Sequence, residues 1–256
     1  MHRFYVPPEE CTGPEIELTG REAHHAAQVL RVRRGDSVHV LDGAGQDLAC
    51  TIRDHGRDRV QLEVVERRSV PPPACEITLL QGLPKGKLFE AIIQKSVELG
   101  ARGIIPLMTE RVVAHFDRED GAAKTERWRM VAIEAIKQCG SAWLPTVEEP
   151  ITPQRFLERG QSPELSLFGS LQFNARHPRH YFQSFERSHQ RRPKSVSVWV
   201  GPEGDFSPGE VAALESASIL PITLGPLVLR TETAAAYCLS VVNYELQAPA
   251  SETAQS

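Results

Sequence analysis

Hydrophobic and polar positions follow different patterns in the two parts of this chain. In the first 70 residues apolar side chains alternate with polar ones, as at 60–65, and short apolar runs at 38–41 and 48–52 flank an Asp-Gly-Ala-Gly turn. Such alternation is typical of half-buried strands, and a glycine-rich turn between two of them predicts a hairpin. We therefore expect a small β-barrel here, with one helix over 22–32.

From residue 76 onward, short apolar runs alternate with helical periodicity. Strands are expected at 77–80, 103–107, 165–168, 196–200 and 222–224, and helices over 88–99, 125–139 and 231–246. A further helix is expected to start at Ser207-Pro208-Gly209-Glu210, which combines a capping box with proline at the first helical position. Strands and helices in alternation predict an α/β domain with a mostly parallel sheet.

Three consecutive prolines, at 71–73, separate the two patterns. Proline cannot donate to a strand ladder, and consecutive prolines favour an extended spacer. We expect one domain over 1–70 and a second over 74–248.

The composition is that of a globular protein, with 41% hydrophobic and 24% charged residues. No apolar run approaches the roughly 20 residues of a membrane helix, and the first residues lack the apolar segment of a secretory signal. The five cysteines are scattered and never spaced as Cys-x-x-Cys, which indicates reduced thiols rather than disulfides or a zinc site. We expect a cytoplasmic protein without a metal.

The net charge of −4 does not by itself indicate a nucleic-acid-binding protein, because such domains are usually basic. Positive charge is concentrated locally, at 31–34, at 53–59 and most densely at 176–194. The last stretch is either a solvated loop or an RNA-binding element, and the sequence leaves both interpretations open.

Two glycine-bearing turns near the C-terminus carry the candidate chemistry. Gly201-Pro202-Glu203-Gly204 follows one predicted strand, and 224–234, with an Arg-Thr-Glu-Thr cluster, follows the next and leads into a helix. Glycine removes side chains where a ligand must approach the backbone, and it tolerates positive φ. Together the two turns predict a shared small-molecule site.

The same residues carry a family resemblance. The Gly-Pro-Glu-Gly turn and the Leu-Gly-x-x-x-Leu-Arg-Thr-Glu-Thr-Ala run at 224–234 resemble the SPOUT class of RNA methyltransferases and, within it, the RsmE family, which methylates N3 of a uridine in small-subunit ribosomal RNA. The resemblance continues upstream at 2–5, 24–36, 95–100 and 134–140. It implies a trefoil-knotted α/β domain, a PUA-like RNA-binding domain at the N-terminus, and a homodimer.

The resemblance also implies S-adenosylmethionine as cofactor and 16S rRNA in the small ribosomal subunit as partner. The residues expected to bind the cofactor are those of the two turns and of the preceding strand end: Phe168, Gly169, Val200, Gly201, Pro202, Glu203, Gly204, Leu224, Gly225, Leu227, Leu229 and Thr231. The residues expected to contact RNA are Arg3, His24, Arg31, Arg33, Lys85 and Lys95.

Arg230 and Glu232 are the candidate catalytic residues. A cation beside the target base would stabilise the uridinate that forms when N3 loses its proton, and a guanidinium stays protonated and so cannot serve as the base. Glu232 could accept that proton, although a capping or orienting role at the start of the last helix is the favoured interpretation.

The chain departs from the family pattern at three places. Asp205 stands where a third glycine is expected, Ser141 stands where arginine is usual, and 167–194 matches poorly. These departures keep open a second interpretation, a non-catalytic RNA-binding or ribosome-assembly protein that retains the fold. A P-loop at 82–88 and a dinucleotide fingerprint at 43–45 are disfavoured because their glycine spacing is wrong.

Overall fold

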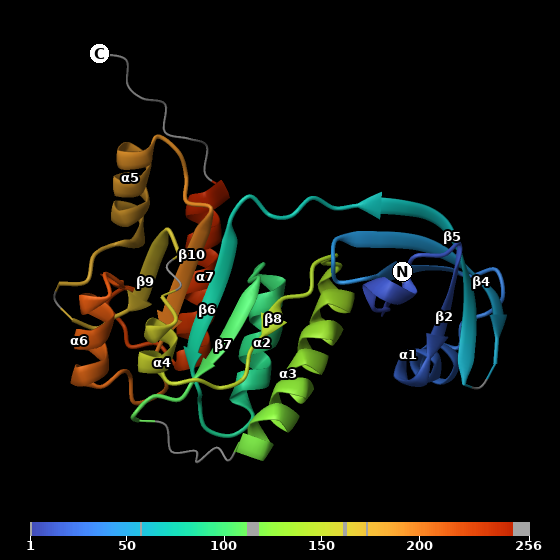
Figure 1. The fold of residues 1–256 in the computed structure, drawn as a ribbon, viewed down its shortest axis with the longest axis horizontal. Coiled ribbons are helices and arrows are strands. Elements are labelled where there is room, and N and C mark those ends of the chain that lie inside the picture. Colours follow the sequence, from blue (N-terminus) through green and yellow to red (C-terminus); the bar gives the residue numbers. More distant parts are fainter. Residues whose placement is uncertain (1, 57, 112–117, 161–162, 173, 248–256) are drawn as a thin grey trace. The chain divides into compact units, whose positions relative to one another are not determined.

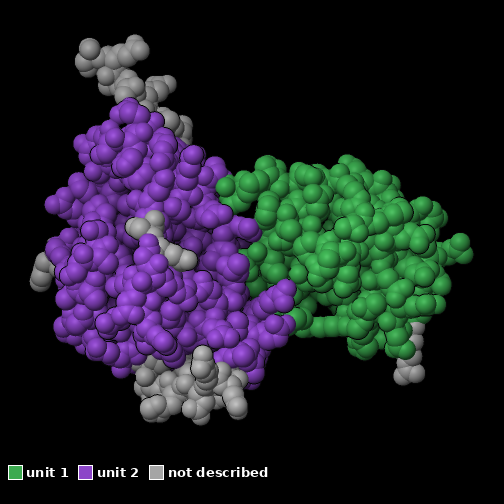
Figure 2. Space-filling model, in the orientation of Figure 1, with its two compact units in different colours: residues 1–73, 130–145 green, residues 74–129, 146–256 purple. Residues whose placement is uncertain are grey.

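The computed structural model describes residues 2–56, 58–111, 118–160, 163–172 and 174–247. The chain forms two compact units, coloured separately in Figure 2. The first comprises 1–73 and 130–145, and the second comprises 74–129 and 146–256. The segment 130–145 lies outside the predicted domain over 1–70.

The first unit is built on a five-stranded sheet in the order β1-β3-β4-β5-β2 (Figure 1). Its strands are β1 (His2–Tyr5), β2 (Glu15–Thr19), β3 (Ser37–Leu41), β4 (Gln46–His55) and β5 (Arg59–Ser69). All neighbours are antiparallel except β1 and β3. The alternating apolar positions point into one core, which includes Phe4, Val40, Leu48 and Leu62.

The helix expected over 22–32 is two short elements. α1 (Gly20–His24) continues directly into a π-helical turn, η2 (His25–Leu30). Arg31 ends this turn with a left-handed backbone, φ +52°.

The end of a long helix completes the first unit. Lys137, near the C-terminus of α3 (Arg118–Cys139), is buried and places its ammonium 2.7 Å from Glu22 and 3.1 Å from Glu134. The Arg3 guanidinium donates hydrogen bonds to the last carbonyls of α3, those of Lys137 and Gln138. Arg3 therefore caps this helix.

The second unit contains a six-stranded, all-parallel sheet in the order β11-β9-β10-β6-β7-β8 (Figure 1). Its strands are β6 (Glu76–Gly82), β7 (Gly103–Leu107), β8 (Thr146–Val147), β9 (Leu165–Gly169), β10 (Ser195–Val200) and β11 (Leu220–Ile222). The predicted α/β class with a parallel sheet is thus confirmed. The strand expected at 222–224 ends at Ile222, and the chain beyond it is free to form a cavity wall.

The helices of the second unit are α2 (Leu88–Glu98), the first part of α3, α4 (Pro153–Glu158), α5 (Pro178–His189), α6 (Pro208–Ser216) and α7 (Thr231–Gln247). α4 and α6 share a core with Trp199 of β10, whose ring meets Phe156 edge-on at 5.3 Å. α7 contacts β6 and β10 and packs against α2 and α5. In the described part of the chain no helix is long and apolar enough to cross a bilayer.

The central part of the basic stretch at 176–194 forms helix α5, whereas Arg176, Arg191, Arg192 and Lys194 lie outside it. His177 caps it by accepting a hydrogen bond from the Arg179 backbone N–H, and Pro178 occupies the first helical position. Three arginines of the stretch pair with carboxylates: Arg179 with Glu245 at 3.0 Å, Arg191 with Glu164 at 2.7 Å and Arg192 with Glu186 at 3.1 Å. Half of its six cations are therefore neutralised within its own unit.

Candidate functional site

A cavity of about 560 Å³ lies where β9 and β10 end and α7 begins. Ligands of open parallel sheets bind at this edge, beyond the carboxyl ends of the strands. Most of the predicted cofactor residues line it: Gly169, Val200, Gly201, Pro202, Glu203, Leu224, Gly225, Leu227, Leu229 and Thr231. The two glycine turns, about 20 residues apart in the sequence, thus line one cavity.

Two residues predicted for this cavity lie elsewhere. Phe168 is only 1% exposed and packs in the core under α4 and α6, and Gly204 lines a neighbouring cavity. The cavity also has lining residues that were not predicted: Leu88, Ser170, Leu171, Asp205, Val228 and Ala234. All but Leu88 are close sequence neighbours of predicted residues, whereas Leu88 comes from the start of α2 and carries no local signal.

Gly201 is required by close packing rather than by a positive φ. A Cβ atom on it would lie 2.8 Å from the Asp205 carboxylate oxygen and 3.1 Å from the Phe206 backbone nitrogen. Asp205 itself takes the left-handed conformation, with φ +59°, and its carboxylate accepts the Phe206 N–H at 2.8 Å. The turn thus forms without the third glycine, because aspartate tolerates this region better than most residues.

A buried polar network fastens this turn to α7. The Thr231 hydroxyl donates to the Gly201 carbonyl at 2.6 Å and accepts from the Gln81 side-chain amide at 2.9 Å. Gln81 is fully buried at the end of β6. Beside it, a Cβ on Gly82 would lie 2.5 Å from two atoms of Pro202. The end of β6 therefore supports the cofactor turn from behind, a role that the sequence did not indicate.

Arg230 and Glu232 both line the cavity. The Arg230 carbonyl accepts the Ala234 N–H at 2.8 Å, so Arg230 stands immediately before the first turn of α7. Among the described residues neither side chain has a hydrogen-bond or ion-pair partner, and Arg230 is exposed. Glu232 lies in the first turn of α7, where a negative charge is favourable. Both side chains are available to a bound ligand.

The six residues predicted to contact RNA are dispersed. Arg3 caps α3, as described above, and Lys95 pairs with Glu98 at 2.8 Å. Lys85 lines the neighbouring cavity. Those near η2, namely His24, Arg31 and Arg33, are exposed. Their contacts with RNA stay predictions.

Ser141 has a local structural partner. Its hydroxyl donates to the Trp143 carbonyl at 3.0 Å and accepts the Trp143 N–H at 3.2 Å. The side chain thus stabilises the turn after α3.

The cysteines are free thiols. Cys11, Cys50, Cys75 and Cys238 are buried, and Cys139 is exposed. Burial raises the pKa of Cys11, Cys75 and Cys238 to about 12 and that of Cys50 to about 11. These four thiols are therefore protonated, and so weakly nucleophilic, near neutral pH.

Comparison with known proteins gives consistent matches. Residues 71–243 match the model of an RNA methyltransferase domain, and 18–65 match that of an RNA methyltransferase PUA domain. The chain is 32% identical to the ribosomal RNA small subunit methyltransferase E of Synechocystis sp., over 96% of this chain and 78% of that protein.

Two solved structures are similar over almost the whole chain. One is a Legionella pneumophila protein, described as a methyltransferase and solved with the cofactor SAM bound, at 32% identity and a TM-score of 0.85, covering 94% of this chain and 96% of that one. The other is ribosomal RNA small subunit methyltransferase E from Neisseria gonorrhoeae bound to S-adenosyl methionine, at 26% identity and a TM-score of 0.82, covering 95% and 97%.

Proposed function

The chain belongs to the RsmE family of RNA methyltransferases, and on that premise we propose that it methylates N3 of a uridine in the 16S rRNA of the small ribosomal subunit, with S-adenosylmethionine as methyl donor. The observation that carries this proposal is the cavity at the strand ends, where both glycine turns and Arg230 meet. The proposed location is the cytoplasm, where this substrate is made.

The cavity suits the cofactor in size and chemistry. Its volume of about 560 Å³ lies within the range of roughly 300–1,000 Å³ typical of small-molecule sites. Leu224, Leu227 and Leu229 supply apolar walls for an adenine ring, and the turn at 201–203 supplies backbone groups. When bound there, S-adenosylmethionine supplies an electrophilic methyl group.

Arg230 is proposed to prepare the uridine for attack. N3 carries a proton at neutral pH, and the negative charge left on the base when that proton leaves needs a nearby cation. The Arg230 guanidinium has no carboxylate partner among the described residues and faces the cavity. Fixed charges aimed at developing charge are usually the largest single catalytic contribution. Glu232, two residues after Arg230 in the first turn of α7, is proposed to orient the site or stabilise the start of this helix.

We further propose that the protein acts as a homodimer with a knotted second unit. Thr233, Tyr237, Ser240 and Tyr244 are exposed at intervals of four, three and four residues and so form one stripe along α7. Leu227 and Val228, just before this helix, are 72% and 79% exposed. Exposed apolar surface of this kind supports a protein interface.

The deciding experiment is methyl transfer from labelled S-adenosylmethionine to small subunits that lack the modification, followed by nucleoside analysis of the RNA. We expect N3-methyluridine at a single position. Binding of the cofactor by calorimetry separates the alternatives: binding without transfer indicates another RNA target. Absence of both would favour the non-catalytic RNA-binding protein.

A further inference from the structure

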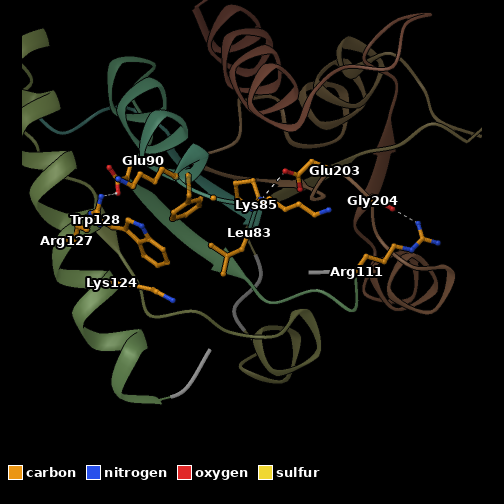
Figure 3. A pocket seen from close by; sticks show the side chains of 13 residues that line it. Leu83, Lys85, Glu90, Arg111, Lys124, Arg127, Trp128, Glu203 and Gly204 are labelled. Carbon is orange, nitrogen blue, oxygen red and sulfur yellow. Dashed lines mark hydrogen bonds and ion pairs between the residues drawn. The ribbon is translucent and has the colours of Figure 1, made fainter. Parts of the chain in front are cut away.

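A second cavity, of about 610 Å³, lies beside the cofactor cavity in the same unit (Figure 3). The two share Glu203. The floor of the second cavity is apolar: Leu83, Phe89 and Trp128 line it and are each buried. The Phe89 and Trp128 rings meet edge-on, with centroids 4.6 Å apart.

Positive side chains surround this apolar floor. The cations that line the cavity are Lys85, Lys87, Arg111, Lys124 and Arg127, and the anions are Glu90 and Glu203. Arg127 pairs with Glu90 at 2.6 Å, and the Glu203 carboxylate accepts the Lys85 backbone N–H at 3.0 Å.

Two of these lysines, Lys85 and Lys87, are not neutralised by a described carboxylate. Within the described ranges, the ammonium groups of Lys85 and Lys87 have no carboxylate partner, and both residues are exposed. Although the net charge of the chain is −4, this cavity is lined by five cations and two anions, which favours an anionic ligand.

We propose that this cavity binds a nucleotide of the substrate RNA that neighbours the target uridine, an inference that rests on the proposed function. Lys85, Lys87 and Arg111 contact its phosphate, and its base lies over the apolar floor. Backbone phosphates supply most of the affinity of proteins for RNA, and an unstacked base finds apolar contact with aromatic side chains. An RNA strand whose target base enters the cofactor cavity continues over Glu203 into the second cavity, because Glu203 lines both cavities.

The cations are tied to the turn that forms the cofactor cavity. The Arg111 guanidinium donates to the Gly204 carbonyl, and Lys85 is joined through its N–H to Glu203 (Figure 3). A phosphate held by these residues is thereby fixed relative to the wall of the cofactor cavity. Such positioning of the RNA strand reduces the freedom lost when the target base reaches the methyl donor.

The test compares the double variant Lys85→Ala/Lys87→Ala with Arg129→Ala/Arg155→Ala, which removes the same number of positive charges from exposed positions that line neither cavity. Affinity for a single-stranded 16S rRNA fragment is measured by fluorescence anisotropy over a salt series without cofactor. KM for small subunits is measured in parallel. Of the two double variants, we expect only Lys85→Ala/Lys87→Ala to bind RNA about tenfold or more weakly than the wild type. The slope of its log affinity against log salt concentration should be smaller by about 1, and its cofactor affinity should be unchanged.

Restoration by Lys85→Arg/Lys87→Arg supports a charge contact. Equal RNA affinity and equal salt slope in the lysine variant and the wild type would overturn the inference, even if the wild type transfers methyl groups normally. If the wild type transfers no methyl group, the proposed function fails. The anisotropy comparison then still decides whether this cavity binds RNA.

Discussion

At the scale of single residues, the cofactor turn at 201–205 places an aspartate, rather than a glycine, in the left-handed backbone conformation. Gly201 has no room for a side chain, since its Cβ would lie 2.8 Å from the Asp205 carboxylate oxygen. The positive φ of the same turn belongs to Asp205, whose carboxylate bonds its neighbour's N–H. The departure from glycine at 205 is therefore compatible with the turn that the cavity needs.

Replacing Arg230 with alanine should abolish most methyl transfer without unfolding the protein. The side chain is exposed and packs in no core, so the cost falls on the reaction, by about 10²–10³ in kcat, as for loss of one preorganised donor. Turnover assays alongside circular dichroism and cofactor calorimetry check this. Arg155→Ala is the matched control, and near-normal turnover in Arg230→Ala would remove Arg230 from the mechanism.

At the scale of elements, local sequence patterns predicted the strands and helices that line the cofactor cavity. They missed features whose place depends on tertiary packing. The capping box at Ser207 and Glu210 is formed as predicted, and Gly100 has the positive φ of a residue just beyond a helix. α4 and α5 were not predicted, although Pro153 and Pro178 stand at their starts. The apolar runs in these two helices are short, so their sequences alone resemble those of loops. Gln81 and Leu88 reach the site only through the packing of their elements in the second unit.

Gly82→Ala tests the support that β6 gives to the cofactor turn. The new Cβ would lie 2.5 Å from Pro202, so the turn must shift, and we expect lower cofactor affinity with a loss of about 1–3 kcal/mol in unfolding free energy. Calorimetry and urea unfolding measure the two effects. Gly121→Ala is the control, because nothing lies within 4 Å of its Cβ position and α3 should gain about 0.5–1 kcal/mol there.

Ionisation of Glu164 should make the stability of the second unit depend on pH. Its fork-shaped pairing with Arg191, together with the Lys194 N–H, lowers the pKa of the Glu164 carboxyl to about 2. Because the pKa of Glu164 in the folded state is below the usual value of 4.5, its ionised carboxylate stabilises the folded protein above pH 4.5. This stabilisation is lost as the pH falls toward 2.

The difference in Tm between the wild type and Glu164→Gln should therefore be largest near neutral pH and shrink on acidification. Thermal scans from pH 7 to pH 2.5 measure it. Glu158→Gln, at an exposed position without an ion pair among the described residues, should differ from the wild type by the same amount at every pH. A constant difference for Glu164→Gln would contradict the assignment.

At the scale of the whole molecule, the two units match two different family models. The first unit, with its PUA match at 18–65, exposes arginines near η2. The second, with its methyltransferase match at 71–243, holds both cavities. Segment 130–145 belongs to the first unit through contacts such as that of Lys137 with Glu22, which no boundary signal in the sequence could indicate.

The proposed dimer can be tested on α7. Tyr237→Glu places a charge on the exposed stripe, where it would be buried without a partner in an interface. Light scattering after size exclusion should show the mass of a dimer for the wild type and of a monomer for Tyr237→Glu. Val65→Glu, at a position on β5 of the first unit that is 67% exposed against 41% for Tyr237, should keep the dimer mass. A monomeric wild type would contradict the proposal.

Glu203 lines both cavities, and its carboxylate holds the backbone of Lys85. Occupation of either cavity thus acts on a residue that the other ligand also meets. Thermodynamic linkage makes this effect reciprocal: whatever factor the cofactor gains in affinity from bound RNA, the RNA gains from bound cofactor. On the proposed assignment of the two cavities, a positive coupling through Glu203 would make each ligand select for the presence of the other.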